Sequence, residues 1–170
     1  MDKQPLVIKT GREDVLLREY VIGDSKAIFH VVNKNRDHLS RWGDVTSGKY
    51  PDEASVAESI RHPVSPGRLR MGIWRNNVFT GSINLAALPA PYHAEVGYWL
   101  GQEYTGNGLM TAAVRAITVY AFETVEYFHL KANVRKENLR SQKVLERVGF
   151  RVTSAADVYL NYALSAFEFG

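Results

Sequence analysis

Residues 95–111, Glu-Val-Gly-Tyr-Trp-Leu-Gly-Gln-Glu-Tyr-Thr-Gly-Asn-Gly-Leu-Met-Thr, decide the fold of this 170-residue chain. An apolar run typical of a strand leads into a glycine turn, and the pattern of residues 112–122 predicts a helix. Amides at a helix start lack partners within the helix and lie at the positive end of its dipole. Glycines remove the Cβ atoms that would hold a ligand away. The segment therefore indicates either a backbone site for a phosphate or an ordinary glycine turn before a helix.

Two common phosphate sites do not fit this turn. Gly101 and Gly106 have the spacing of a P-loop, but Asn107-Gly108 stands where such a loop needs Lys followed by Ser or Thr. A dinucleotide-binding turn needs a third glycine at position 111, where this chain has Thr111. A pyrophosphate held by backbone alone remains the phosphate ligand that the segment favours.

Outward from this segment, the sequence predicts a mixture of strands and helices. The expected order is β-β-α-α-β-β-β-α-β-α-β, which indicates an α+β fold, an α/β sandwich around a mixed sheet. Asp24 is expected to cap the first helix, residues 33–50 are expected to be irregular, and one strand is expected from Arg151 onward. The other expected elements are two strands within 7–20, helices at 24–32, 51–62 and 138–148, and strands at 71–74, 78–85, 93–100 and 129–134.

Composition limits the classes of function. The chain has no cysteine, which excludes disulfides and a cysteine nucleophile, and no metal site is expected. A formal net charge of +3 is compatible with an anionic ligand but too small to indicate nucleic acid. The N-terminal residues 1–5 lack a signal-peptide pattern, and no apolar run reaches the ~18 residues of a membrane span. We therefore expect a cytoplasmic protein that binds neither nucleic acid nor membranes.

A second motif makes the interpretation of the first motif more specific. Residues 138–150, Asn-Leu-Arg-Ser-Gln-Lys-Val-Leu-Glu-Arg-Val-Gly-Phe, follow the glycine turn by about thirty residues. Together the two segments resemble the GCN5-related N-acetyltransferase (GNAT) superfamily, whose members have a Gln/Arg-x-x-Gly-x-Gly/Ala loop and an Asn-x-x-Ala/Ser-x-x-Leu/Val-x-x-x-x-Gly-Phe helix. Residues 95–100 and 35–42 (Asn-Arg-Asp-His-Leu-Ser-Arg-Trp) look most like the branch of ribosomal-protein N-terminal acetyltransferases (RimJ/RimL-like).

The resemblance implies one acetyltransferase domain over residues 1–170, with a mixed, mostly antiparallel central sheet flanked by helices. It implies that acetyl-CoA is the co-substrate and that the acetyl group passes directly to a primary amine. A homodimer is common in this branch. The residues expected to hold the coenzyme are Tyr98, Trp99, Leu100, Thr105, Gly106, Asn107, Gly108, Leu109, Met110, Asn138 and Ser141.

The resemblance also implies roles in the reaction. Glu95 is expected to accept the amine proton through water, and Ser141 to donate to the sulfur that leaves. Plainer interpretations exist: Glu95 can be a solvent-facing strand residue, and Asn138 can be only the N-cap of its helix. The residues expected to line the acceptor groove are His38, Arg41, Trp42, Tyr92 and His93, although Trp42 can equally be a loop anchor.

Two positions depart from the family pattern. Glu103 replaces the Gln/Arg before the glycines, so we expect it to face solvent and to make no contact with the phosphates. Leu145 stands where many members of the family carry a tyrosine that acts as the general acid of the reaction. Without that acid, an α-amine of pKa ~7.7–8.0 suits the site better than a lysine of pKa ~10.4. A protein or peptide N-terminus is therefore the expected acceptor; a small amine or a non-catalytic acyl-CoA-binding module are the alternatives.

Overall fold

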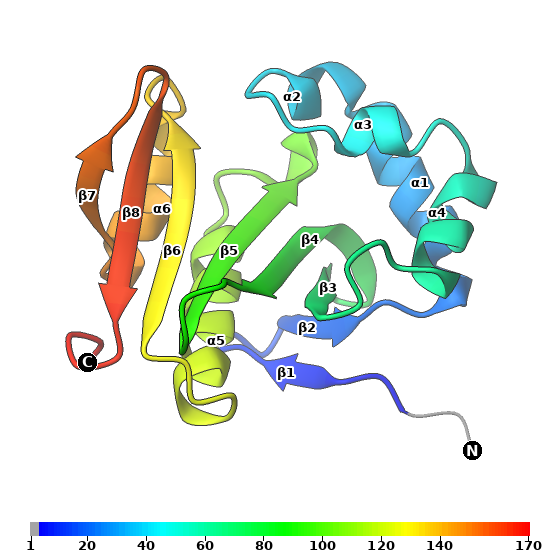
Figure 1. Ribbon diagram of the computed structural model, residues 1–170. Coiled ribbons are helices and arrows are strands. Elements are labelled where there is room, and N and C mark those ends of the chain that lie inside the picture. Colours follow the sequence, from blue (N-terminus) through cyan, green and yellow to red (C-terminus); the bar gives the residue numbers. More distant parts are fainter. Residues whose placement is uncertain (1–3) are drawn as a thin grey trace.

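The structure is a computed structural model that describes residues 4–170; Met1 to Lys3, part of the segment predicted to lack a signal peptide, lie outside the described residues. Within this part of the chain, one sheet has eight strands in the order β1-β2-β3-β4-β5-β6-β8-β7 (Figure 1). The strands are β1 Val7–Lys9, β2 Val15–Glu19, β3 Arg68–Arg75, β4 Val78–Ala87, β5 His93–Leu100, β6 His129–Arg135, β7 Arg151–Ala155 and β8 Tyr159–Ser165.

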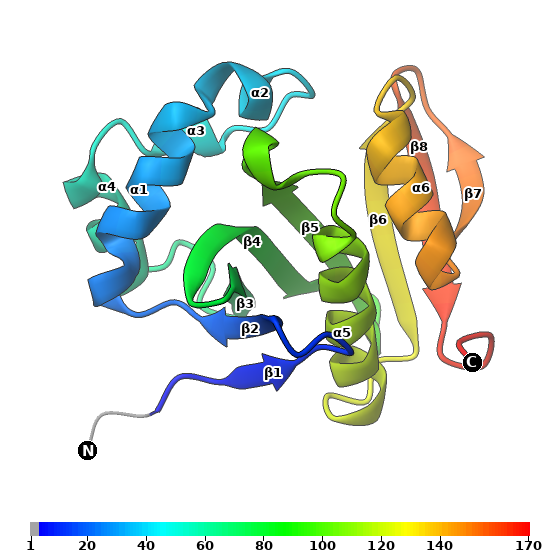
Figure 2. The ribbon, with the colours of Figure 1, turned by 180° about the vertical axis from the view of Figure 1, so that it is seen from behind.

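Helices cover both faces of the sheet. In Figure 2, α5 and α6 lie in front of the sheet, while α1 to α4 gather beside its β2–β5 half. The helices are α1 Ser25–Lys34, α2 Arg36–Ser40, α3 Thr46–Lys49, α4 Glu53–Arg61, α5 Leu109–Glu123 and α6 Leu139–Val148, with 3₁₀ turns at Ile22–Asp24 and Gln102–Tyr104. The expected mixed, mostly antiparallel sheet flanked by helices is confirmed.

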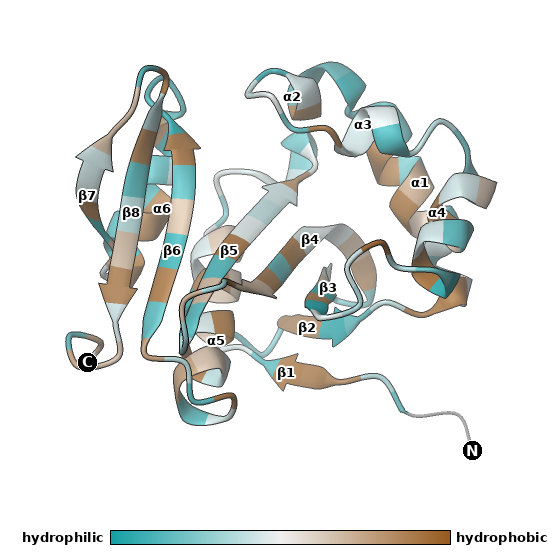
Figure 3. Ribbon diagram, in the orientation of Figure 1, coloured by the Kyte–Doolittle hydropathy of each residue, from teal (hydrophilic) through white to brown (hydrophobic). Residues whose placement is uncertain are grey.

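Each face of the sheet has its own apolar core. The larger core holds Ala113, Val114 and Ile117 of α5 together with Leu145 and Val148 of α6. A smaller core joins α1, α2 and α4 to the opposite face around Phe79. β6 buries only one of its faces, in the larger core, so its buried and exposed residues alternate. Figure 3 shows this as alternating hydrophilic and hydrophobic bands along β6.

Local sequence signals account for most element ends. The side chain of Asp52 accepts a hydrogen bond from Ser55 N (2.7 Å) and caps α4, so the helix begins at Glu53, two residues after the expected start at 51. Gly149, at φ +114°, ends α6. The β3–β4 hairpin turns at two asparagines, Asn76 and Asn77, whose positive φ angles suit a two-residue turn.

Three expectations about the elements were wrong. Asp24 does precede α1, but its carboxylate binds Arg18 and the amide of Val21 in place of capping the helix. Residues 33–50 contain α2 and α3, which are short helices held by packing and so leave little periodic signal. The segment after Gly149 forms two strands, β7 and β8, and β8 inserts beside β6.

One irregularity of the sheet creates the space for a site. β5 and β6 form the parallel pair among the described strands, and they pair only over His93–Glu95 and His129–Lys131. Beyond these residues the two strands separate, and their C-terminal ends point apart in Figure 1. None of the helices within residues 4–170 is long and apolar enough to cross a membrane.

Candidate active site

A cleft of about 620 Å³ opens where β5 and β6 separate. Residues 96–100 of β5 line one side and residues 132–135 of β6 line the other. The glycine turn and α6 close one end, and the α2–α3 region reaches the opposite end. The cleft therefore joins the two sequence motifs to the segment that was expected to bind the acceptor.

The glycine turn presents unpaired amides at one end of the cleft. Gly106 and Gly108 adopt positive φ angles of +83° and +72°, which favour glycine. Among residues 4–170, no backbone or side-chain oxygen accepts a hydrogen bond from the amides of 106–111. An added Cβ at Gly106 would meet nothing within 4 Å. Open space before a row of free amides fits a phosphate group, which is the ligand that the turn indicated.

Basic side chains extend this anion site. Arg140, Lys143 and Arg147 follow one face of α6 and line the cleft beside the glycine turn. Arg140 Nη1 also donates to Thr105 Oγ1 (3.2 Å), which ties α6 to the turn. Several phosphates can thus meet positive charge as well as backbone amides, which is the donor set that a coenzyme A molecule requires.

Ser141 forms a hydroxyl pair that the sequence interpretation missed. The Tyr98 hydroxyl lies 2.8 Å from Ser141 Oγ and 3.3 Å from the Ser141 carbonyl oxygen, which can accept from it. Burial raises the pKa of Tyr98, so its hydroxyl stays protonated at neutral pH. The alternation along β5 could have indicated this contact, because Ala94, Val96 and Tyr98 share the face that packs against α5 and α6.

Leu145 is a core residue and does not line the cleft. Its side chain is fully buried in the core beneath α6, where a phenol would displace apolar packing. Asn138, in contrast, performs the local role that its position predicted: its Oδ1 accepts from Ser141 N (3.2 Å) and caps α6. Asn138 also lines the cleft, so a contact with coenzyme A remains open to it.

Glu95 does not line the cleft, although the next residue, Val96, does. Glu95 is the last residue of β5 that pairs with β6, opposite Lys131. Its Oε2 accepts a hydrogen bond from Nδ2 of Asn133 (3.4 Å), and Asn133 does line the cleft. A proton that moves from the cleft to Glu95 would therefore have to pass through a water molecule or past the side chain of Asn133.

The acceptor end of the cleft holds two of the five residues expected there. His38 and Trp42 line it, and burial lowers the pKa of His38 below its usual value of 6.5. Asp44, Arg135 and Tyr159 line it too, and the sequence interpretation missed all three. No local pattern marks them, because they come from separate strands and a loop.

Arg135 is the most distinctive of these residues. Its guanidinium lies 5.5 Å from the ring centre of Tyr159, and its Nε is buried with no hydrogen-bond partner in the described chain. Gly43, at φ +80°, brings the α2–α3 loop against this guanidinium: a Cβ there would lie 3.3 Å from Nη2. The α2–α3 loop and β6 thus hold the positively charged guanidinium of Arg135 at the edge of the cleft.

Several expected site residues lie elsewhere. Tyr92 and His93 sit at the end of β5 that pairs with β6. The Tyr92 ring contacts that of Phe128 at a tilt (ring centres 5.0 Å apart), and His93 stacks on His129 (4.5 Å). Neither these two residues nor Arg41 and Asn107 line the cleft. The opposite end of β5 is too far from Trp42 for Tyr92 and His93 to share its groove.

Glu103 is exposed, as expected, and it also makes contacts that the sequence interpretation missed. Its side chain forms an ion pair with Lys34 (3.1 Å) and accepts a hydrogen bond from Asn35 Nδ2 (3.0 Å). Asn35 Oδ1 in turn accepts from Gln102 N (2.8 Å). Glu103 therefore anchors the end of β5 to α1, and these contacts turn its charge away from the phosphate end of the cleft.

A parallel strand pair that separates beside a glycine turn with free backbone amides fits an acyltransferase that takes its acyl group from coenzyme A. Residues 14–151 match the model of the acetyltransferase (GNAT) domain, and the chain belongs to this family. The protein is an acetyl-CoA-dependent N-acetyltransferase. This enzyme assignment sets aside the alternative of a non-catalytic module.

Three similar proteins illustrate the relationship. A probable N-acetyltransferase of Bacillus subtilis, YjcK, is 42% identical over 144 residues, covering 80% of each chain. The putative ribosomal N-acetyltransferase YdaF of the same organism is 27% identical over 148 residues, covering 81% of this chain and 78% of YdaF. The structure of Mycobacterium smegmatis RimJ in complex with CoA-disulfide superposes with a TM-score of 0.77 at 25% identity, covering 98% of this chain and 91% of RimJ.

Proposed function

We propose that the acceptor is the α-amino group at the N-terminus of a protein or peptide. The charge of the cleft carries this proposal. Among the described residues that line the cleft, Arg140, Lys143 and Arg147 lie beside the glycine turn, which leaves one cation, Arg135, and one carboxylate, Asp44, for the acceptor. A polyamine or an aminoglycoside carries several positive charges, and a single carboxylate beside Arg135 would hold it poorly. A peptide N-terminus carries one ammonium group followed by neutral carbonyls.

Asp44 and Arg135 match these two parts of a peptide. The Asp44 carboxylate already accepts from Thr46 N (2.7 Å), which fixes its position at the edge of the cleft, and it can attract the ammonium group. The unpartnered guanidinium of Arg135 can donate to the first carbonyl groups. The similarity to proteins named ribosomal N-acetyltransferase supports a peptide acceptor.

The donor is proposed to lie along the lining that the two motifs share. Amides of the glycine turn and the basic face of α6 would hold the phosphates, and the β5 backbone at Tyr98 to Leu100 would orient the thioester carbonyl. Bound acetyl-CoA supplies an acetyl group already activated as a thioester. Trp99, Thr105, Leu109 and Met110 line the same region.

Proton transfer is proposed for three side chains of the chain itself. Glu95 would accept the amine proton through water. When Tyr98 donates to Ser141 Oγ, the Ser141 hydroxyl is free to donate a hydrogen bond to the leaving sulfur, which would stabilise the thiolate while Glu95 holds the proton taken from the amine. Two hydroxyls in series compensate for the apolar residue at position 145.

A panel of amines tests the acceptor. We expect kcat/KM for peptides with a free N-terminus to exceed that for N-acetylated peptides containing lysine, and for spermidine or an aminoglycoside, by about tenfold or more, because more of an α-amine is neutral near pH 7.5. An equal or higher value for lysine side chains or spermidine would contradict the proposal. A homodimer and a cytoplasmic location stay predictions.

A further inference from the structure

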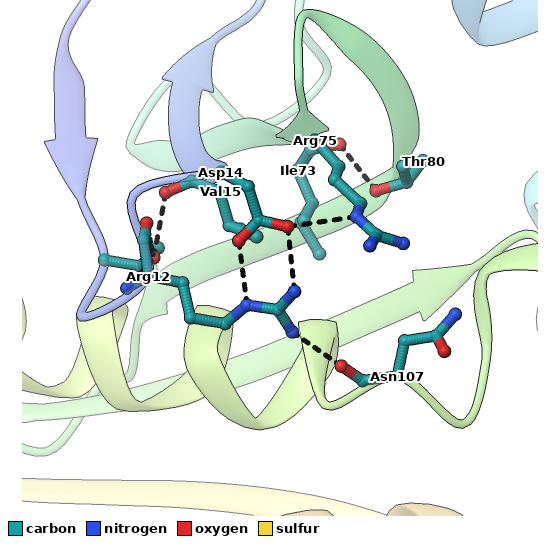
Figure 4. Close-up of polar contacts among 8 residues, drawn as sticks. Arg12, Asp14, Val15, Ile73, Arg75, Thr80 and Asn107 are labelled. Atoms are coloured by element: carbon teal, nitrogen blue, oxygen red, sulfur yellow. Dashed lines mark hydrogen bonds and ion pairs between the residues drawn. The ribbon is translucent and has the colours of Figure 1, made fainter.

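The turn between β1 and β2 touches the glycine turn, although 95 positions separate them in the sequence. Nη1 of Arg12 donates to the carbonyl oxygen of Asn107 at 2.5 Å. Figure 4 shows the Arg12 side chain extended along the start of α5 toward this carbonyl. Arg12 lies outside both motifs of the family, and it contacts the backbone rather than the side chain of Asn107.

The Arg12 side chain is itself held in place. Its Nε and Nη2 donate to the two carboxylate oxygens of Asp14 at 3.0 and 2.8 Å, a two-bond arrangement with fixed geometry. Arg75 Nε binds the same carboxylate at 3.0 Å (Figure 4). The Arg12 guanidinium also holds the pKa of Asp14 below its usual value, so this pair stays charged at neutral pH. The third nitrogen of the guanidinium is thus aimed at Asn107.

The direction of this carbonyl determines the direction of an amide. In a planar trans peptide, the carbonyl of Asn107 and the N–H of Gly108 point opposite ways. Gly106 and Gly108 line the cleft, whereas Arg12 and Asn107 do not. A carbonyl held toward Arg12 therefore leaves the Gly108 N–H facing the cleft.

The glycines make this orientation easy to lose. Glycine reaches either sign of φ at little cost, so the peptide between Asn107 and Gly108 can rotate if nothing holds it. A rotated peptide would point the Asn107 carbonyl at the cleft, where its negative end would repel a phosphate.

We propose that Arg12, fixed by Asp14, is a positioning residue for the pyrophosphate of the donor: it holds the Asn107–Gly108 peptide with its N–H toward the cleft. Arg12 acts through the peptide and contacts no substrate. The proposal rests on the proposed position of the pyrophosphate at the glycine turn and is independent of which amine accepts the acetyl group.

Calorimetric titration of coenzyme A into the purified protein tests the proposal. We expect Arg12→Ala to raise the Kd about tenfold, the effect of one charge-assisted contact, and Asp14→Asn to raise it less. Arg12→Lys should recover little affinity, because an ammonium group cannot bind Asp14 with two bonds and also reach Asn107. Arg68→Ala, which removes an exposed arginine at the far end of β3, is the charge-matched control and should leave the Kd unchanged.

A truncated donor separates positioning from damage to the fold. S-acetylpantetheine lacks the pyrophosphate, so Arg12→Ala should lower kcat/KM about tenfold for acetyl-CoA and leave the value for S-acetylpantetheine unchanged. An unchanged Kd for Arg12→Ala, wild-type affinity in Arg12→Lys, or equal losses with both donors would overturn the proposal. Wild-type affinity in Gly106→Glu/Gly108→Glu would instead show that the pyrophosphate lies elsewhere, which refutes the donor site itself.

Discussion

The hydroxyl of Tyr98 on β5 lies 2.8 Å from the hydroxyl of Ser141 on α6, and the two residues are 43 positions apart in the sequence. Both residues line the cleft. Position 145, where the sequence comparison with the family expects a tyrosine, is a buried leucine in this chain.

Removing the pair should affect turnover more than donor binding. We expect Ser141→Ala to lower kcat about 10²-fold and Tyr98→Phe about tenfold, since a positioned acid contributes on this scale. The double variant should be little worse than Ser141→Ala alone, because the two groups act in series. Steady-state kinetics with acetyl-CoA and a peptide would check this. Fully additive losses would show that the hydroxyls act separately.

Glu95 should matter for the acceptor proton. We expect Glu95→Gln to lower kcat/KM about 10²-fold relative to the wild type near pH 7. The loss in kcat/KM should be smaller at high pH, because the α-amine is already neutral there. Glu123→Gln, an exposed carboxylate at the end of α5, is the matched control. If Glu95→Gln and the wild type show the same pH–rate profile, Glu95 is only a strand residue bonded to Asn133.

Asp44 offers a test of acceptor recognition that leaves its loop intact. Asp44→Asn keeps an oxygen for the Thr46 amide and removes only the charge. We expect the KM for a peptide to rise about tenfold and the KM for acetyl-CoA to stay the same, since uniform binding of one substrate is lost. We expect Arg135→Met likewise to raise the KM for the peptide and to leave the KM for acetyl-CoA unchanged. A rise in the KM for acetyl-CoA would place Asp44 at the donor.

His38 predicts a pH dependence of stability. Burial lowers its pKa in the folded protein below 6.5, and the nearby positive charges of Arg41 and Arg140 act in the same direction, against the negative charge of Glu103. The unfolded chain thus binds this proton more readily, so the contribution is complete above about pH 6.5 and is lost as the pH falls through the folded pKa.

Urea unfolding at pH 7.5 and pH 5.5 measures this effect. We expect the wild type to lose stability between these values, and His38→Gln to lose less of it. Equal losses in the two proteins would show that the proton on His38 does not couple to folding.

Much of the cleft lining around the glycine turn could be predicted because its signals are local. A glycine turn, an asparagine cap and a glycine stop act on neighbours within about four residues, so they remain legible in the sequence. The same reasoning did not reveal the partners of Glu103, because Lys34 and Asn35 lie at the end of α1. It failed for Tyr92 and His93 because β5 places them at the closed end of the strand pair.

The sequence by itself determined the order of most elements, the glycine turn with its free amides, and the helix start that carries Ser141. Hydrogen bonds and φ preferences between near neighbours suffice for these features. Only the tertiary structure decided that β5 and β6 separate, that Tyr98 meets Ser141, and that Arg12 holds Asn107. Those contacts join residues from distant parts of the chain, and no local periodicity records which distant side chains will meet once the sheet has formed.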